Sequence, residues 1–258
     1  MDVLQAVLEK KSAEVAEAKR RIPLGAIREQ AERVQDIRDF KKALQKPPIA
    51  IIAEITKEAS SSDTLVEKYD HLEMALQFQA GGAHALSVVA DTKSVQHQKS
   101  FVRDIKDLTN VPILRKDLII DEYQVYESRV FGADALLLMV RALTKTQLSE
   151  LHQCATTMGL AVLVEAQSED EVRTANEMGA DIVGINNRDQ VTLAFDIEQS
   201  IRLRPLIRKG ALAFSDGGIF SPIDVRTLQS AGFKAVLVGQ AFIRYPDKSA
   251  GVRSIISG

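Results

Sequence analysis

The chain has 258 residues, a formal net charge of −2, and apolar residues at 45% of its positions. This length suits one large α/β domain or two small ones, and the apolar fraction is ample for a buried core. A near-neutral charge without a polybasic tract argues against nucleic acid or an anionic membrane as the main partner. The sequence shows neither a signal peptide nor an apolar run of about eighteen residues. We therefore expect a cytoplasmic protein with no membrane partner.

Cys154 is the single cysteine, which excludes an internal disulfide and suits a reducing compartment. Its neighbours Leu151, Met158 and Leu160 are apolar, so we expect the thiol to serve packing. The histidines lack the spacing of metal ligands, and we expect no metal site at His71, His84, His97 or His152.

Two helices are predicted before the first strand. Residues 2–21 carry apolar side chains at helical spacing, and Pro23 ends that helix. A second, shorter helix is expected over residues 36–45, where the pair Pro47-Pro48 stops it. We interpret residues 1–48 as an N-terminal helical cap on a single domain that spans residues 1–258.

From residue 49 onward, short apolar runs alternate with helical segments. Eight near-continuous apolar runs predict a parallel sheet closed into a single (β/α)8 (TIM) barrel with the N-terminal helical extension. A doubly wound open sheet is the alternative, but the chain lacks an early G-x-G-x-x-G turn, and eight regular units favour closure. The expected strands cover residues 49–55, 84–89, 112–114, 135–139, 161–164, 181–185, 211–214 and 235–238. Five of the helix-to-strand transitions share a glycine, at Gly82, Gly132, Gly159, Gly179 and Gly232.

The stretch 112–139 shows one such unit in full: strand, helix and next strand. Asp121, followed three residues later by Gln124, resembles a capping box, and Gly132 stands where a glycine ends the helix. A lysine, Lys116, follows the first apolar run. Parallel α/β folds place their chemistry at the carboxyl ends of the strands, so Lys116 is the first candidate catalytic residue.

Other polar residues follow the strands at the same end of the predicted barrel. Glu54 follows the first apolar run, Glu165 the fifth, and Asn186 and Arg188 the sixth. These residues either form ion pairs at the rim of the barrel without a catalytic role or act together in catalysis. A lysine near glutamates in a partly desolvated cleft can act as a general acid, with a glutamate as base. This combination suits proton transfer on a phosphorylated small molecule.

Glycine-bearing turns follow the seventh and eighth runs. In barrels these two loops commonly bind phosphate through bare backbone N–H groups, and the helix expected from Ser221-Pro222 would add a positive N-terminal end. Glycine there can instead serve an unusual backbone dihedral alone. We predict a phosphate site built from Ser215, Gly217, Gly218, Gly239 and Gln240.

Over nearly its whole length the sequence resembles the indole-3-glycerol phosphate synthase family. The matching stretches are the N-terminal helix, IIAEI (51–55), GGAHALSVVAD (81–91), VPILRKDLIIDEYQVYESRVFGADALLLM (111–139), VLVEA (162–166), GADIVGINNRD (179–189) and AVLVGQAFIR (235–244). The resemblance implies a lyase of tryptophan biosynthesis. Such an enzyme closes the ring of an anthranilate-bearing ribulose phosphate with loss of carbon dioxide and water, and it uses no cofactor or metal.

The resemblance also implies roles for individual residues. Lys116 matches the general acid that protonates the carbonyl oxygen, and Glu165 matches the base of the later dehydration. Glu54 matches the carboxylate that orients lysines and substrate hydroxyls. Asn186 matches a residue that binds the intermediate, and Arg188 one that helps with the anthranilate carboxylate or the local ion network. Further substrate contacts are assigned to Lys57, Ser60, Leu118 and Leu137, and Gly218 and Gly239 match the phosphate cradle.

Several positions depart from the family pattern. Thr56 stands in place of a second active-site lysine, and the following loop has one inserted residue. Gly217 replaces a serine of the phosphate site, and Leu118 an aromatic residue. Contacts to the aromatic ring are also changed at Ala90, Ser94 and Val95. Two alternatives therefore stay open, a different phosphorylated substrate and a non-catalytic binding or partner subunit.

These interpretations give expectations that the structure can refine. The partner is expected to be a phosphorylated small molecule and not nucleic acid, while a monomeric state and contact with other tryptophan-pathway enzymes stay open. Substituting Lys116 by alanine is expected to abolish turnover and leave folding intact. Restoring the family residues with Thr56→Lys and Gly217→Ser is expected to improve substrate binding.

Overall fold

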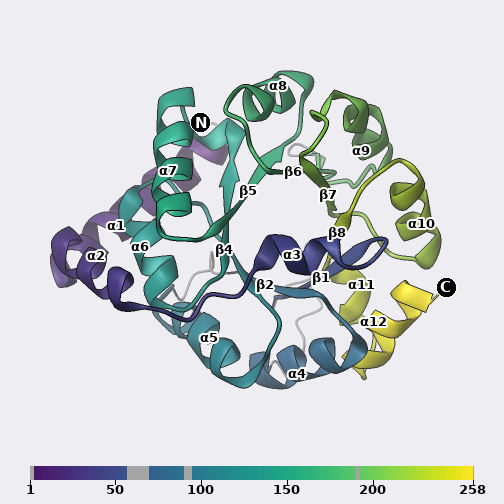
Figure 1. The fold of residues 1–258 in the computed structure, drawn as a ribbon, viewed down its shortest axis with the longest axis horizontal. Coiled ribbons are helices and arrows are strands. Elements are labelled where there is room, and N and C mark those ends of the chain that lie inside the picture. Colours follow the sequence, from purple (N-terminus) through teal and green to yellow (C-terminus); the bar gives the residue numbers. More distant parts are fainter. Residues whose placement is uncertain (1–2, 57–69, 90–94, 190–191, 258) are drawn as a thin grey trace.

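The computed structural model describes residues 3–56, 70–89, 95–189 and 192–257, and it contains a closed barrel of eight parallel strands paired in sequence order. The predicted (β/α)8 barrel is confirmed. Figure 1 shows the strands as a central ring surrounded by helices, with α1 and α2 on one side of that ring. The strands are β1 (Ala50–Ile55), β2 (Ala85–Val89), β3 (Ile113–Lys116), β4 (Ala135–Met139), β5 (Ala161–Ala166), β6 (Ile182–Asn186), β7 (Leu212–Asp216) and β8 (Ala235–Val238).

The helices alternate with the strands along the chain. Three precede the barrel, namely α1 (Val3–Arg21), α2 (Leu24–Arg33) and α3 (Phe40–Gln45). The α-helices that follow are α4 (His71–Gly81), α5 (Val95–Leu108), α6 (Glu122–Val130), α7 (Lys145–Thr157), α8 (Glu169–Glu177), α9 (Glu198–Leu203), α10 (Pro222–Ser230), α11 (Gln240–Ile243) and α12 (Lys248–Ser257). Two short 3₁₀ helices, η1 (Val140–Ala142) and η2 (Arg204–Leu206), lie after β4 and α9. No helix in the described part of the chain is both long and apolar enough to cross a membrane.

The N-terminal helices differ from the sequence prediction. The helix expected over residues 36–45 begins only at Phe40, because Asp39 is its N-cap and accepts a hydrogen bond from the Lys42 N–H. Helix α2 was not predicted at all. It buries Ile27 and Ala31 against Tyr123 and Tyr126 of α6. Two buried residues give only a weak helical pattern in the sequence, and the packing on α6 stabilises the helix.

The strands extend further than the apolar runs that predicted them. Strands β3, β5, β6 and β7 continue to Lys116, Ala166, Asn186 and Asp216. Lys116, Glu165, Asn186 and Asp216 are therefore the last or last but one residues of their strands and do not follow them. Side chains alternate between the two faces of a strand, so each polar position inherits the inward direction of the apolar residue two positions earlier.

The barrel interior is filled by apolar side chains. Leu114, Leu137, Leu163 and Phe214 belong to one buried cluster of inward-facing residues. Phe40 of α3 joins this cluster and is 1% exposed. In Figure 1, α3 crosses the end of the ring. Phe40 on this helix packs against the inward-facing residues of the barrel.

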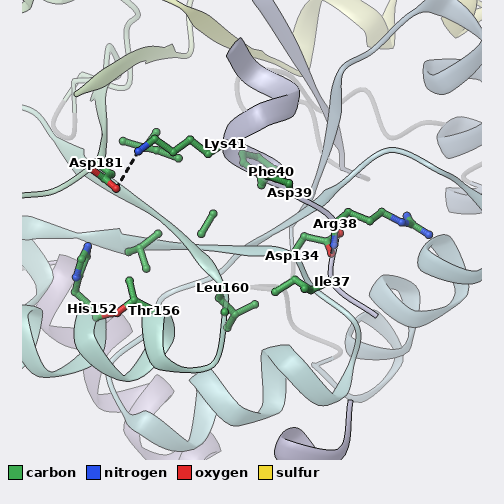
Figure 2. Close-up of a pocket in the computed structure, with 14 residues that line it drawn as sticks. Ile37, Arg38, Asp39, Phe40, Lys41, Asp134, His152, Thr156, Leu160 and Asp181 are labelled. Atoms are coloured by element: carbon green, nitrogen blue, oxygen red, sulfur yellow. Dashed lines mark hydrogen bonds and ion pairs between the residues drawn. The ribbon is translucent and has the colours of Figure 1, made fainter. Parts of the chain in front are cut away.

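A pocket of about 380 Å³ opens at this amino-terminal end (Figure 2). Ile37 and Leu160 line it with the first residues of β5 and β6. At its edge Lys41 and Asp181 form an ion pair of 2.9 Å, drawn in Figure 2. It lies at the end of the barrel opposite to the polar strand ends.

The five repeated glycines form the turns between helix and strand that the sequence predicted. Each has a positive φ, between 76° and 96°, directly after a helix. An L-residue with a side chain is strained in that region, which explains why the same residue recurs at each of these turns. Before α6, Asp121 is the N-cap, but Gln124 accepts from the Ile120 N–H and not from that of Asp121. The Asp121 side chain itself accepts from the Tyr123 N–H and not from that of Gln124, so the predicted capping box is wrong although Asp121 caps the helix.

Gly184 provides a test of the interior packing. It pairs with Phe214 across β6 and β7, and a Cβ at position 184 would come within 2.0 Å of Phe214 Cζ. Gly184→Ala is expected to lower the free energy of unfolding by about 1–3 kcal/mol, because overpacking forces side chains off their rotamers. Urea denaturation measures the change.

Gly25→Ala is the matched control, since nothing lies within 4 Å of a Cβ at this position of α2. Alanine there is expected to stabilise the protein slightly, by about 0.5–1 kcal/mol. Equal urea midpoints for Gly184→Ala and the unchanged protein would contradict the packing of Phe214 over β6.

Candidate active site

A polar pocket of about 260 Å³ lies at the carboxyl end of the barrel. It is the end where parallel strands present functional groups. The polar strand ends Glu54, Lys116, Asn186 and Asp216 all reach it. The remaining lining residues are Arg141, Arg188, Phe195, Gly217, Gly218, Ile219, Phe220, Leu237, Val238, Gly239 and Gln240.

Lys116 lies at the centre of a carboxylate cluster. Its Nζ is 2.8 Å from Glu54 Oε2 and 2.8 Å from Asp216 Oδ2. Burial disfavours the ammonium, yet Asp216, Glu54 and Glu165 together raise the pKa of Lys116 above its usual value. The lysine is therefore charged throughout the neutral range and can donate a proton to a substrate oxygen that becomes basic during reaction.

Glu165 is the buried carboxyl of this cluster and is 2% exposed. Burial and the neighbouring Asp216 raise its pKa to about 7, against the opposing effects of Lys116, a hydrogen bond from Asn186, and Arg141. Its Oε2 has no hydrogen-bond partner among the described residues. A carboxyl whose pKa lies near neutrality can both accept and return a proton during turnover.

Asn186 is held so that its amide nitrogen is available to Glu165. Its Oδ1 accepts a hydrogen bond of 2.9 Å from the Arg188 N–H. Its backbone carbonyl accepts from Gln199 Nε2 at 2.7 Å. With the oxygen engaged, the NH₂ group is left to donate to the carboxyl.

Buried ion pairs fix the backbone on both sides of Lys116. Arg115 Nη2 lies 2.7 Å from Asp117 Oδ2 and 2.8 Å from Glu127 Oε2. Lys11 of α1 reaches Asp117 Oδ1 at 2.8 Å, so the N-terminal helix is tied to the end of β3. Because Arg115 and Asp117 alternate with Lys116 along the strand, their outward pairing holds Lys116 toward the pocket.

Asp216 and Arg141 were not assigned a role from the sequence. Asp216 lies two residues after the inward-facing Phe214, so the strand period was the signal that could have placed it. Arg141 lies in η1, past the end of β4, where no repeating pattern indicates direction. Its place in the pocket depends on tertiary structure alone.

The two glycine turns lie at the pocket but differ in what they contact. Gly217 and Gly218 have φ of 84° and 74°, and a Cβ on either would meet the Phe195 side chain within 3.0 Å. Gly239 has an ordinary negative φ, and a Cβ there would come within 2.8 Å of Glu54 Oε1. Glycine is thus needed at position 239 for the close approach of Glu54.

Ser215 does not face the pocket. Its Oγ accepts a hydrogen bond of 2.9 Å from Asn187 Nδ2 and lies 2.8 Å from Ser200 Oγ, in a buried group on the outer side of β7. Asn187 Nδ2 also donates to the Gly217 carbonyl at 2.9 Å and so holds the first glycine turn. Asn187 is a positioning residue that the sequence did not single out.

The start of α10 is occupied by its own side chains. Ser221 and Asp224 form a capping box, and Asp224 Oδ2 also accepts from the Phe220 N–H. An acidic side chain already caps this helix end, and its service to an incoming phosphate stays a prediction.

Two predicted substrate contacts that the structure describes, Leu137 and Leu118, do not line the pocket. Leu137 is fully buried inside the barrel, and Leu118, 3% exposed, follows the Asp117 network. Lys57 and Ser60 lie outside the described residues, as do Ala90 and Ser94. Thr56 directly follows β1 and is half-buried.

Gly217→Ser is expected to weaken binding of phosphorylated ligands and not to improve it. A serine at φ 84° is strained, and its Cβ would meet Phe195 Cε1 at 2.8 Å. The inhibition constant of inorganic phosphate against turnover measures the effect, which we expect to be a rise of about tenfold, equivalent to about 1.4 kcal/mol. Unchanged inhibition would show that the turn tolerates the side chain.

The comparisons with known proteins identify the family. The sequence profile of indole-3-glycerol phosphate synthase matches residues 4–255. The chain is 40% identical over 242 residues to the indole-3-glycerol phosphate synthase of Chlorobium phaeovibrioides, covering 93% of this chain and 94% of that protein. It is 38% identical over 265 residues to the synthase of a Roseiflexus species, covering 99% and 98%. The chain belongs to the indole-3-glycerol phosphate synthase family.

Solved structures of other proteins share the fold. A 3-hexulose-6-phosphate synthase matches with a TM-score of 0.64 at 14% identity, over 80% of this chain and 98% of that one. Orotidine 5'-phosphate decarboxylase from Pyrococcus horikoshii matches with a TM-score of 0.60 at 13% identity, over 80% and 96%. At such identities the likeness concerns the barrel alone.

Three cationic side chains among the described residues line the pocket. Lys116 is the one lysine that lines it among the described residues. Two arginines, Arg141 and Arg188, supply the other positive charges. No three His, Cys, Asp or Glu side chains in the described part of the chain are grouped so as to hold a metal ion.

Proposed function

We propose that this chain is an active indole-3-glycerol phosphate synthase. It converts 1-(2-carboxyphenylamino)-1-deoxyribulose 5-phosphate to indole-3-glycerol phosphate, carbon dioxide and water. The observation that carries the proposal is the charged Lys116 held between Glu54 and Asp216, beside a Glu165 whose pKa is near 7. Lys116 lines the pocket and Glu165 is buried beside it, so an acid and a base act on each other at the carboxyl end of the barrel in a chain of this family.

Ring closure needs an acid at the ketone oxygen. Lys116 donates a proton to that oxygen while the ring carbon bearing the carboxylate bonds to the carbonyl carbon. The bond to the carboxylate then breaks, carbon dioxide leaves, and the electron pair restores the aromatic ring. Glu54 and Asp216 support this step because they orient the ammonium from two sides.

Dehydration completes the product. The hydroxyl formed from the ketone leaves as water after it receives a second proton, and a proton leaves the neighbouring CH₂ carbon to form the new double bond. Glu165 is suited to accept it, because a pKa near 7 leaves a substantial part of the carboxyl ionised at neutral pH. Asn186 donates a hydrogen bond to Glu165 and so helps to hold its carboxyl in place.

The phosphate is assigned to the glycine turns after β7 and β8. Gly217 and Gly218 bring bare backbone to the pocket, and Gln240 begins α11 after β8, the strand that pairs with β7. Oriented backbone N–H groups of this kind bind anions. Ser215 contributes through the turn that it supports and not through its own hydroxyl.

A steady-state assay with this substrate tests the proposal. Indole fluorescence is expected to appear with saturation kinetics, and inorganic phosphate is expected to compete. Binding of the substrate without any indole product would instead support the binding-subunit alternative, which no observation favours at present. A monomeric state and a cytoplasmic location stay predictions from the sequence.

A further inference from the structure

We propose that Arg141 binds the aromatic carboxylate of the substrate, the group that leaves as carbon dioxide. The inference rests on the proposed function and adds a specificity residue to it. It follows from the place of Arg141 in the barrel, from the edge of its guanidinium that is left unpaired, and from the engagement of the other nearby cations.

The barrel topology places Arg141 across the pocket from the glycine turns. The strands pair in sequence order around a closed ring, so β4 stands opposite β8. Arg141 follows β4, whereas the glycine turns follow β7 and β8. A substrate whose phosphate lies at those turns and whose ketone lies at Lys116 of β3 extends its aromatic end toward the β4 side.

The guanidinium of Arg141 is anchored at one nitrogen. Its Nη1 donates a hydrogen bond of 2.6 Å to Gln167 Oε1. Gln167 is held in turn, because its Nε2 donates to the Arg188 carbonyl at 2.9 Å and its backbone N–H to Glu171. The Nε is buried and has no hydrogen-bond partner among the described residues. The edge formed by Nε and Nη2 is the one that arginine uses to hold a carboxylate through two parallel hydrogen bonds.

The other cations of the pocket are already engaged. Lys116 is paired with Glu54 and Asp216 and has its own part in proton transfer. The guanidinium of Arg188 lies over the Phe195 ring, 5.8 Å from its centroid, on the side of the first glycine turn. Arg141 is therefore the cation best placed for a second anion of the substrate.

This placement links decarboxylation to the later proton transfer. The positive charge of Arg141 acts on Glu165 and lowers its pKa against the effect of burial. A bound carboxylate neutralises that charge. When carbon dioxide leaves, the charge of Arg141 acts on Glu165 again and favours its ionised form, which is the form that the dehydration requires.

Two inert ligands that lack the ketone can test the inference. One is 1-(2-carboxyphenylamino)-1-deoxyribitol 5-phosphate, and the other is the same compound without the carboxylate. Their dissociation constants are measured by calorimetry with the unchanged protein, Arg141→Met, Arg141→Lys and the control Arg188→Met. Circular dichroism and melting temperature check that each variant is folded.

The unchanged protein is expected to prefer the carboxylated ligand by about 10- to 100-fold. Arg141→Met is expected to lose that preference, with the affinity for the phenyl ligand within about twofold of the original, and Arg141→Lys to keep part of it. Arg188→Met is expected to retain the preference, in contrast to the role at the anthranilate carboxylate that the family resemblance implied for Arg188. A preference that survives in Arg141→Met, or that vanishes in Arg188→Met, would overturn the inference. If neither ligand binds the unchanged protein, the proposed function itself fails.

Discussion

Replacing Lys116 by methionine is expected to lower kcat/KM by about 100- to 10,000-fold, because the substitution removes the general acid while keeping the length of the side chain. The sequence alone led us to expect that losing Lys116 leaves folding intact, but the structure predicts a loss of stability as well. Glu54 and Asp216, both largely buried, each lie 2.8 Å from Lys116 Nζ. Removing one partner of a buried ion pair costs about 3–5 kcal/mol, so the variant should be less stable.

The loss of stability in Lys116→Met depends on pH with a definite sign. Without the ammonium, the pKa of Glu165 loses the lowering effect of Lys116 and rises further above its unfolded value. The folded state then binds more protons, so stability is retained at low pH and lost as pH rises through the raised pKa. Urea denaturation at pH 5 and pH 8 measures this difference.

Lys41→Met is the matched control for Lys116→Met. It removes the same side chain from an ion pair of 2.9 Å with Asp181, whose carboxylate is 64% exposed at the opposite end of the barrel. Exposed pairs are worth about 0–1 kcal/mol, and neither turnover nor the pH dependence of stability should change noticeably. Turnover by Lys116→Met within tenfold of the original would exclude this lysine as the acid.

Glu165→Gln is expected to be nearly inactive and yet more stable than the unchanged protein at alkaline pH. The folded state raises the pKa of Glu165 from 4.5 to about 7 through burial and the charge of Asp216. The stability that comes with the protonated form is fully present below the unfolded value and is lost as pH rises through the folded value. Glutamine keeps the neutral shape, so the variant should gain on the order of 3 kcal/mol at pH 8 and nothing near pH 4.

Two measurements separate the catalytic and structural effects of Glu165. The pH profile of turnover should show an acidic limb near pH 7 that disappears in Glu165→Gln together with at least about 99% of the rate. Urea denaturation across the same range should show the alkaline gain. Glu150→Gln, at an exposed position of α7, should show neither effect. A variant that is destabilised at pH 8 would contradict the raised pKa.

The barrel could be predicted from the sequence because its signals are local and repeated. An apolar run and a glycine of positive φ recur with each unit, and Gly132 illustrates the turn. Helix α2 carries little local signal, since Ile27 and Ala31 are its buried residues and packing on α6 stabilises it. A pattern search therefore finds the barrel and misses that helix.

Those residues of the candidate site could be predicted whose place depends only on their position in a strand. Lys116 and Asn186 end their strands and Glu165 is the last but one residue of β5, all on inward positions, as the alternation of side chains requires. The partners that set their charge could not be read locally, because the pairing of Lys116 with Asp216 joins β3 to β7. The packing of Phe195 against Gly217 likewise depends on a tertiary contact, which is why a serine at that position looked favourable from the sequence alone.

The central claim is that this pocket closes an indole ring by the proton chemistry of Lys116 and Glu165. A single-turnover experiment tests it most directly, with enzyme in excess over 1-(2-carboxyphenylamino)-1-deoxyribulose 5-phosphate and both carbon dioxide and indole fluorescence followed. Equal amounts of carbon dioxide and indole-3-glycerol phosphate are expected from the unchanged protein, and neither from Lys116→Met over the same time. Substrate that binds and is recovered intact from the unchanged protein, or equal indole formation by Lys116→Met, would contradict it.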